Sequence, residues 1–393
     1  MLMNETIPVL MVAPELAPWK TGGVAILIQK LASAVAATDR VRLTVLGTVA
    51  KGCQPGPPDY HPSIGFELIE KPRAPEPFYH LLLQLRYRAG LREWLRRNPG
   101  GVIHFGILPG ARTLLAAAAA VRCGAPRVTT MVDWPPLENH YHRHPQAHWA
   151  HWQLARILLG RFPLLLANSH FIAKQVRKAY PAAEVTVIPN GICPEEWDPQ
   201  EPPALLEGSP RFLYWGLLWR KKGVDILLKA LALLRERGFP DARLYIVGEG
   251  EEEEALKSLC RKLALELVVE FLGRVEQARL RSLVHASDVA VFPSVYEGFG
   301  IAILEAMVCG KATVTTAHGG PREFMSDGKD GILVGEWDAA SLAGALERIA
   351  RSKTLAQVIG RNARETALRY TWQAIAPRYV DLYARLSRDA SKG

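Results

Sequence analysis

The strongest constraint on the fold of this chain is a repeated alternation of short β-rich runs with helical patterns. Twelve runs have the apolar, β-branched character of strands: Val9–Ala13, Val41–Leu46, Val102–Phe105, Val128–Val132, Leu164–Ala167, Val185–Ile188, Arg211–Trp215, Leu244–Val247, Val269–Leu272, Asp288–Phe292, Ala312–Thr316 and Ile332–Val334. Helical patterns such as Asp225–Leu234 lie between most of them. This order predicts an α/β protein whose parallel sheets are covered on both faces by helices. Twelve strands are too many for one open sheet, so we expect two doubly wound, Rossmann-like domains.

The domain boundary is expected after Ile188–Asn190, which gives a first domain of residues 1–190 and a second of residues 191–371. The proline- and acid-rich stretch 193–210 that follows predicts a linker and irregular structure. Ligands of such folds bind at the carboxyl ends of the strands. Two facing sheets would therefore place an active site in the cleft between the domains.

The composition favours a cytoplasmic protein. No apolar run approaches the length of a membrane span, and the first residues lack the basic region of a signal peptide and lead into the first strand. The five cysteines are scattered without a Cys-x-x-Cys pair, which argues against a zinc site or a disulfide framework.

The net charge of +9 is compatible with nucleic acid, an anionic membrane or anionic small substrates as partners. No nucleic-acid-binding motif accompanies the charge, so we expect no nucleic acid partner. Five arginines lie in the helical stretch between Leu81 and Arg97. Two interpretations remain open: a basic amphipathic helix in peripheral contact with an anionic membrane, or an ordinary helix whose apolar side lies in the core.

One segment carries most of the functional signal: two carboxylates, Glu297 and Glu305, eight residues apart around a Gly-x-Gly turn. A short strand precedes the turn and a helical pattern follows it. The free N–H groups of Gly300, Ile301 and Ala302 would form an anion site at the helix N-terminus. The two carboxylates would flank the bound anion. A nucleoside diphosphate bonded to a sugar has the matching chemistry, with phosphates for the amides and hydroxyls for the carboxylates.

Together with Ala317–Glu323, this segment resembles the donor site of retaining GT-B glycosyltransferases, the large group (glycosyl transferases group 1) that includes glycogen and sucrose synthases. The resemblance implies the GT-B fold, with a last helix at about 372–393 that returns to the first domain. It implies that Glu297 lies against the donor sugar and that Glu305 holds the ribose. The expected donor-binding residues of the second domain also include Gly298, Phe299, Gly300, Ile301, Arg274 and Val275, the last two at the base.

Two further loops resemble parts of the same donor site. Gly22 and Gly23 follow the first strand and would contact phosphate through their amides, although a plain strand-to-helix turn explains them as well. In the loop between Gly216 and Gly223, Lys222 matches the family's lysine that grips the diphosphate and stabilises the leaving group. Leu217 stands where the family has an arginine. Arg220 is the residue that could reach in instead.

A second departure lies after the expected strand Val128–Val132, where Val132 replaces the family's histidine and Asp133 is retained as a candidate catalytic residue. A histidine- and tryptophan-rich stretch, His140–His151, follows. It is open to three interpretations: a polar, partly packed loop, an acceptor-sugar site or a metal site. The residues lack a recognised metal-ligand spacing and the family needs no bound metal, so we expect none.

These residues predict a retaining glycosyltransferase that moves a sugar from a UDP-, ADP- or GDP-sugar to an acceptor hydroxyl without a cofactor. The sugar-type acceptor would be a glycan, a glycolipid or a small molecule. Leu217 and Val132 keep open a non-catalytic nucleotide-sugar-binding protein. A nucleotide-sugar 2-epimerase shares the two-domain architecture and is a further alternative.

Overall fold

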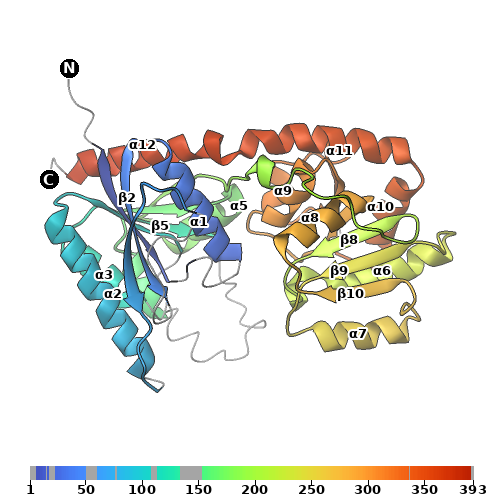
Figure 1. The fold of residues 1–393 in the computed structure, drawn as a ribbon, viewed down its shortest axis with the longest axis horizontal. Helices are drawn as coiled ribbons and strands as arrows, with labels where there is room; N and C mark the ends of the chain where they lie inside the picture. The colour runs from blue at the N-terminus through green and yellow to red at the C-terminus, as the bar shows by residue number, and fades with distance from the viewer. Residues whose placement is uncertain are drawn as a thin grey trace. The chain divides into compact units, whose positions relative to one another are not determined.

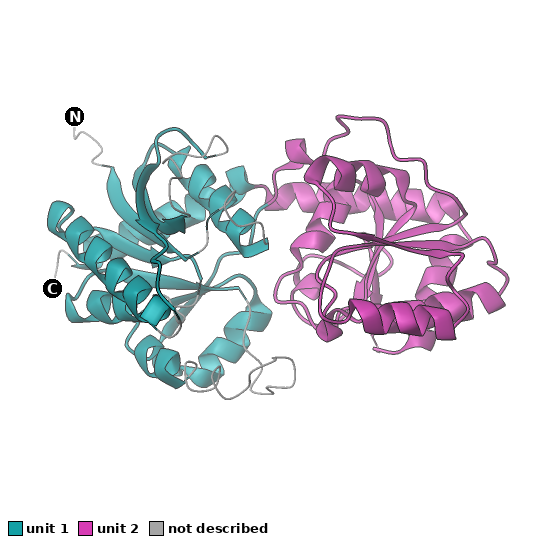
Figure 2. Ribbon diagram, turned by 60° about the horizontal axis from the view of Figure 1, so that its bottom comes forward, with its two compact units in different colours: residues 1–191, 372–393 teal, residues 192–371 magenta. Residues whose placement is uncertain are grey.

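The computed structural model describes residues 6–14, 16, 23–49, 60–75, 78–107, 113–132, 153–335 and 337–390. The chain forms two compact units (Figure 2). Unit 1 comprises residues 1–191 and 372–393, and unit 2 comprises residues 192–371. The boundary expected from the sequence, after residue 190, lies one residue before this division.

Unit 1 contains a seven-stranded sheet in the order β3-β2-β1-β4-β5-β6-β7, and every strand pair is parallel. Its strands are β1 (Ile7–Ala13), β2 (Val41–Val49), β3 (Gly65–Glu70), β4 (Val102–Phe105), β5 (Arg127–Met131), β6 (Leu164–Ala167) and β7 (Glu184–Val187). Strand β3 was not predicted from the sequence. It is an edge strand with only Ile69 buried, so it lacks the apolar run by which the other strands were recognised.

The helices of unit 1 within the described residues are α1 (Gly23–Ala36), α2 (Phe78–Arg97), α3 (Leu114–Arg122), α5 (His170–Ala179) and α12 (Trp372–Ala390). Residues 153–159 are also helical. Ser169 caps α5 by accepting a hydrogen bond from the Ile172 N–H. α12 packs on α1, β1 and β4 (Figure 1). α2 packs on α3, β2 and β3. Leu83, Tyr87, Leu91 and Trp94 form the buried side of α2, whereas Leu81, Leu82 and Leu85 are exposed.

A buried histidine fixes α12 to the sheet. His104 of β4 lies 2.7 Å from the hydroxyl of Tyr383 on α12 and 2.7 Å from that of Thr130 on β5. Its ring also stacks near Tyr379. Burial lowers the pKa of His104 to about 3, so the imidazole is neutral and shares hydrogen bonds instead of carrying a charge. The last helix is therefore an integral part of unit 1.

Unit 2 contains a six-stranded parallel sheet in the order β10-β9-β8-β11-β12-β13. Its strands are β8 (Arg211–Trp215), β9 (Arg243–Val247), β10 (Val269–Gly273), β11 (Val289–Phe292), β12 (Ala312–Thr316) and β13 (Ile332–Val334). The order runs outward from β8 in one direction through β9 and β10, and in the other through β11 to β13. The point of reversal between β8 and β11 is the place where a doubly wound sheet opens a crevice at its carboxyl edge.

The helices of unit 2 are α6 (Val224–Glu236), α7 (Glu253–Lys262), α8 (Gln277–Ala286), α9 (Ile301–Val308), α10 (Ala339–Ala350) and α11 (Lys353–Ala367), with short 3₁₀ turns at Pro194–Glu196, Arg220–Lys222, Gly320–Glu323 and Leu368–Tyr370. The stretch 193–210 is irregular as expected but is not a linker. Trp197 is buried beside Trp215, and the His285 ring hydrogen-bonds to the Trp197 carbonyl oxygen, so this stretch is part of the core of unit 2. The two doubly wound parallel-sheet units confirm the fold class predicted from the alternation.

Candidate functional site in unit 2

Two loops meet at the reversal point of the unit 2 sheet, one after β8 and one after β11. The Val295 N–H donates to the Lys221 carbonyl oxygen at 2.8 Å, which joins them through the backbone. Gly223 lies against the second loop, in the left-handed region at φ 68°. A Cβ atom there would lie 2.0 Å from the Pro293 carbonyl oxygen. Glycine is therefore required both by the backbone conformation and by the close approach.

The side chains of the two loops form an ion pair that the sequence analysis did not predict. The Lys222 Nζ lies 2.6 Å from the Glu297 Oε1, and the Ser294 hydroxyl donates to the same oxygen at 2.6 Å. Burial opposes ionisation of Glu297, but the charge of Lys222 and the two hydrogen bonds outweigh it and hold the pKa of Glu297 below its usual value. At neutral pH the pair is therefore a carboxylate and an ammonium group.

The helix that follows Glu297 begins with a tight glycine turn. Gly300 is the N-cap of α9 in the left-handed conformation at φ 97°, and its carbonyl oxygen accepts from the Ile303 and Leu304 N–H groups. The first amides of α9 therefore follow Glu297 by only a few residues, in the loop that leads into the helix. Phe299 is only 3% exposed and its ring packs against Phe324 and Tyr370. Any contact of Phe299 with a ligand would therefore run through its backbone.

Glu305 lies in the second turn of α9 and is partly buried. Its Oε2 accepts a hydrogen bond of 2.8 Å from the indole N–H of Trp215, the last residue of β8. Burial raises the pKa of Glu305 to about 7, the Trp215 hydrogen bond opposes the rise, and the charge of Glu196 adds to it. Glu305 is thus a carboxyl group held at the point of ionisation near neutral pH.

Glycines bring two other loops, one after β9 and one after β12, within backbone contact of these two. A Cβ on Gly319 would lie 2.1 Å from the Glu297 carbonyl oxygen, and the Gly320 N–H donates to that oxygen at 2.9 Å. Gly248, just after β9, would place a Cβ 1.9 Å from the Gly216 carbonyl oxygen. The Gly248–Gly250 loop was missed by the sequence analysis, although a Gly-x-Gly directly after a strand is the signal that marks it.

The three cations of the loop after β8, Arg220, Lys221 and Lys222, have different surroundings. Arg220 is exposed. The Lys221 Nζ lies 5.8 Å from the ring centre of Trp219 and 5.5 Å from that of Tyr296. Its charge also acts on Glu297. Lys221, which was not among the predicted site residues, therefore lies within electrostatic range of the ion pair. Leu217 is 49% exposed in the same loop.

The remaining predicted site residues are divided between described and undescribed parts of the chain. Arg274 is exposed and Val275 is half-buried in the turn after β10, at the same edge of the unit 2 sheet. Gly23 is exposed at the start of α1 in unit 1. Gly22, Asp133 and the stretch from His140 to His151 lie outside the described residues.

Two other properties bear on binding. Within the part of the chain that the structure describes, no three His, Cys, Asp or Glu side chains are grouped as metal ligands would be, and no helix has the length and apolar character needed to span a bilayer.

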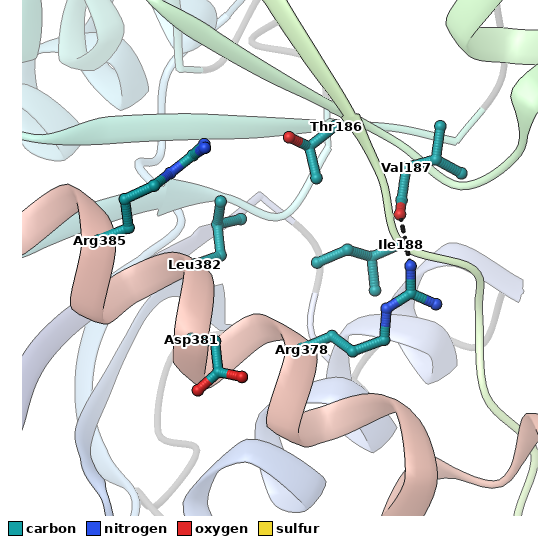
Figure 3. A pocket seen from close by; sticks show the side chains of 7 residues that line it. All are labelled: Thr186, Val187, Ile188, Arg378, Asp381, Leu382 and Arg385. Atoms are coloured by element: carbon teal, nitrogen blue, oxygen red, sulfur yellow. Dashed lines mark hydrogen bonds between the residues drawn. The ribbon is translucent and has the colours of Figure 1, made fainter.

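A hollow of about 240 Å³ lies between β7 and α12 of unit 1 (Figure 3). Its two arginines are already engaged, Arg378 with the Val187 carbonyl oxygen and Arg385 with Glu184.

Comparison with known proteins assigns both halves of the chain. Residues 196–366 match the family model of "Glycosyl transferases group 1", and residues 21–196 match that of "Glycosyltransferase Family 4". The chain belongs to the group 1 glycosyl transferases. The family predicted from Glu297–Glu305 is thereby confirmed, and the group 1 match contains both loops of the candidate site.

Among curated members of this family, the chain is 35% identical over 207 residues to glycogen synthase of Mycobacterium tuberculosis, which covers 52% of this chain and 50% of that protein. It is 32% identical over 242 residues to D-inositol 3-phosphate glycosyltransferase 2 of Catenulispora acidiphila, with 57% and 56% covered. The chain spans about half the length of the curated relatives it matches.

Solved structures of glycosyltransferases share the fold over nearly the full length. Sucrose-phosphate synthase of Thermosynechococcus elongatus aligns with a TM-score of 0.78 at 22% identity, covering 97% of this chain and 99% of that one. Anabaena Alr3699/HepE, solved in complex with UDP and glucose, aligns with a TM-score of 0.72 at 21% identity, with 96% and 100% covered. The fold of this chain is therefore GT-B.

Proposed function

We propose that this protein is a retaining glycosyltransferase that moves a sugar from a nucleotide-diphosphate sugar to an acceptor hydroxyl. The observation that carries the proposal is the Lys222–Glu297 ion pair, with 2.6 Å between Nζ and Oε1. The pair lies at the reversal point of the sheet, in the loops after β8 and β11, and within the residues that match the group 1 family model. In a nucleotide sugar the anomeric carbon is bonded directly to a phosphate oxygen. A residue that contacts the sugar and a residue that contacts the diphosphate must therefore lie close to each other.

The pair supplies two different kinds of stabilisation. When the bond between the anomeric carbon and the phosphate oxygen breaks, its electron pair stays on the phosphate. Lys222 and the first amides of α9 would stabilise that growing negative charge. Glu297, ionised beside the sugar, would stabilise the positive charge that develops on the anomeric carbon. The acceptor hydroxyl would complete the transfer on the face that the diphosphate leaves, with its proton passing to the departing phosphate oxygen.

The other predicted residues complete the donor site as proposals. Glu305 would accept hydrogen bonds from the ribose hydroxyls, and Arg274 and Val275 would lie at the base. The Gly22–Gly23 loop would contact phosphate, and Asp133 would lie at the acceptor side. The nucleotide would be UDP, ADP or GDP, and the acceptor would be a glycan, a glycolipid or a small molecule.

We also propose that the transfer needs no bound metal. Lys222 is fixed by Glu297, and Lys221 is held near two aromatic rings within the electrostatic range of the same carboxylate. Two ammonium groups and a helix N-terminus would supply positive charge to the diphosphate, which in many nucleotide-using enzymes comes from a divalent cation.

One observation favours a second candidate, a nucleotide-sugar-binding protein without transfer activity. Leu217 stands where the family has an arginine, and its side chain is 49% exposed. The diphosphate would therefore bind with one cation fewer at that position. Such a loss would affect the developing charge of the transition state more than the charge of the bound donor.

A single experiment separates these functions. The protein is incubated with UDP-, ADP- and GDP-sugars, with and without candidate acceptors, and free nucleotide, free sugar and glycosylated acceptor are measured. Nucleotide release that depends on an acceptor, with product of unchanged anomeric configuration, supports the proposal. Saturable donor binding without release would support the binding protein. Conversion of the donor sugar without release would identify a 2-epimerase.

A further inference from the structure

One helix of unit 1 exposes a cluster of large apolar side chains. Phe78, Leu81, Leu82 and Leu85 of α2 are each between 38 and 60% exposed. Their spacing of three, four and seven residues places them on one face of the helix. We call these four residues the α2 tip. Single exposed apolar residues are common on protein surfaces, but four on one face of two consecutive turns form a patch.

The α2 tip projects beyond the sheet. Arg86 donates a hydrogen bond of 2.6 Å to the carbonyl oxygen of Glu70, the last residue of β3, and the Tyr87 hydroxyl donates one of 3.2 Å to that of Ala13, the last residue of β1. At Arg86 and Tyr87 the helix is therefore level with the carboxyl ends of the strands. A rise of 1.5 Å per residue places Phe78, the first residue of α2, about 13 Å further along the axis.

Basic residues lie before and after this patch along the chain. Lys71 and Arg73 precede the helix and are exposed, and Arg88, Arg92 and Arg96 continue along the helix from the apolar face. Residues 71–97 contain seven basic and two acidic residues, a net charge of +5 out of +9 for the whole chain. The long arginine side chains can extend their guanidinium groups towards anions while their stems remain on apolar surface. The patch thus combines apolar insertion with positive charge on one element.

We propose that the α2 tip docks unit 1 on an anionic membrane surface, with Phe78 and the leucines among the acyl chains and the arginines at the lipid phosphates. An amphipathic helix with this composition lies at the interface and does not cross the bilayer, in keeping with the absence of a spanning helix among the described residues. A second copy of the chain is the less suitable occupant, since a symmetric contact through α2 would bring the arginines of both copies together.

Vesicle flotation tests the proposal without any reference to transfer activity. The full chain is mixed with phosphatidylcholine vesicles, with or without phosphatidylglycerol, at low and high salt. We expect flotation with the anionic vesicles only, and weaker flotation at high salt because surface charge is screened. Equal binding to neutral vesicles, or no binding to anionic ones, would overturn the proposal.

Matched variants then locate the contact. The double substitution Leu81→Ser, Leu85→Ser should weaken binding to anionic vesicles at least tenfold, while Leu205→Ser, Leu267→Ser, which changes two exposed leucines of unit 2, should leave it unchanged. All four side chains are exposed, so the fold is retained, and circular dichroism checks this. Unchanged binding of the α2 variant would refute the assignment. The assignment would also be refuted if size-exclusion chromatography with light scattering showed that the natural chain is a dimer and the α2 variant is a monomer.

A second pair of variants tests the contribution of the arginines to membrane binding. Arg88→Gln, Arg92→Gln should reduce the affinity roughly thirtyfold, since each basic residue near an anionic surface contributes about fivefold. Arg361→Gln, Arg369→Gln removes the same charge from exposed positions of unit 2 and serves as the control. If the two variants lose affinity equally, the effect belongs to net charge and the α2 surface is not the docking site.

Discussion

The substitution Glu305→Gln should stabilise unit 2 and weaken nucleotide binding at the same time. Glutamine has the shape of the protonated acid and can still accept the Trp215 hydrogen bond, so the change removes only the negative charge. The pKa of Glu305 is raised from 4.5 to about 7 in the folded protein. The folded state therefore holds a proton that the unfolded state releases between these values, and stability falls as pH rises through that window.

The size of the effect follows from the same difference. At about 1.4 kcal/mol per unit of pKa, ionised Glu305 costs the folded state at most about 3 kcal/mol above pH 7, and less where solvent reaches the side chain. The stability difference between Glu305→Gln and the natural chain should be near zero below pH 4.5, grow between pH 4.5 and 7, and stay constant above. Hydrogen exchange of peptides from β8 and β11 measures the stability of unit 2 alone. At pH 8, exchange of these peptides in Glu305→Gln should be slower than in the natural chain, by a factor of up to about 100.

Glu251→Gln removes an exposed carboxylate from the same unit and should leave exchange unchanged at both pH values. The cost in function is read by calorimetric titration with the nucleoside diphosphate, where losing charge-assisted bonds to the ribose should cost about 1–3 kcal/mol. Equal stability of Glu305→Gln and the natural chain at pH 8 would refute the buried charge. Unchanged nucleotide affinity would refute the ribose contact.

Three other outcomes test the site. Lys222→Ala should lower turnover on the order of 100- to 1000-fold with a smaller rise in KM, because the negative charge on the leaving diphosphate grows in the transition state. A comparable loss of turnover in Arg220→Ala would instead assign the stabilisation of the leaving group to Arg220. Activity should survive EDTA, and its full loss with recovery on adding manganese or magnesium would disprove metal-independent transfer. Gly248→Ala should destabilise unit 2 more than Gly238→Ala in thermal unfolding: both have positive φ, but only the first brings a Cβ to 1.9 Å from a carbonyl oxygen, that of Gly216. Equal losses would show that the loop shifts freely.

Local patterns were sufficient for most of the fold. Strands such as Leu164–Ala167 and Arg211–Trp215 were predicted with the bounds they have, because buried parallel strands are continuous apolar runs. Strand β3 was not, since an edge strand with one buried residue has no such run. For α2 the helix was predicted but not its buried side, because with apolar residues on both sides only the packing partner decides which side faces the core.

The candidate site shows the same limit more clearly. Glu297, Glu305 and Lys222 were identified one by one from the motifs around them. Their partners were not, because Lys222 and Glu297 are 75 residues apart and Trp215 and Glu305 are 90 apart. Only the order of strands in the sheet brings β8 beside β11. The raised pKa of Glu305 depends on that burial, so it has no sequence signal at all.

The two ends of unit 2 meet each other. Ile192 pairs with Thr371, and its N–H donates to the Tyr370 carbonyl oxygen at 2.8 Å. In unit 1 the corresponding ends also meet, as Gly191 lies so close to the Trp372 ring that a Cβ would approach it to 2.5 Å. Unit 2 is therefore an uninterrupted segment inserted into a unit whose cut ends adjoin. A gene fragment for residues 192–371 should yield a unit that folds by itself, and joining residue 191 to 372 through a short glycine linker should restore unit 1 as a continuous domain.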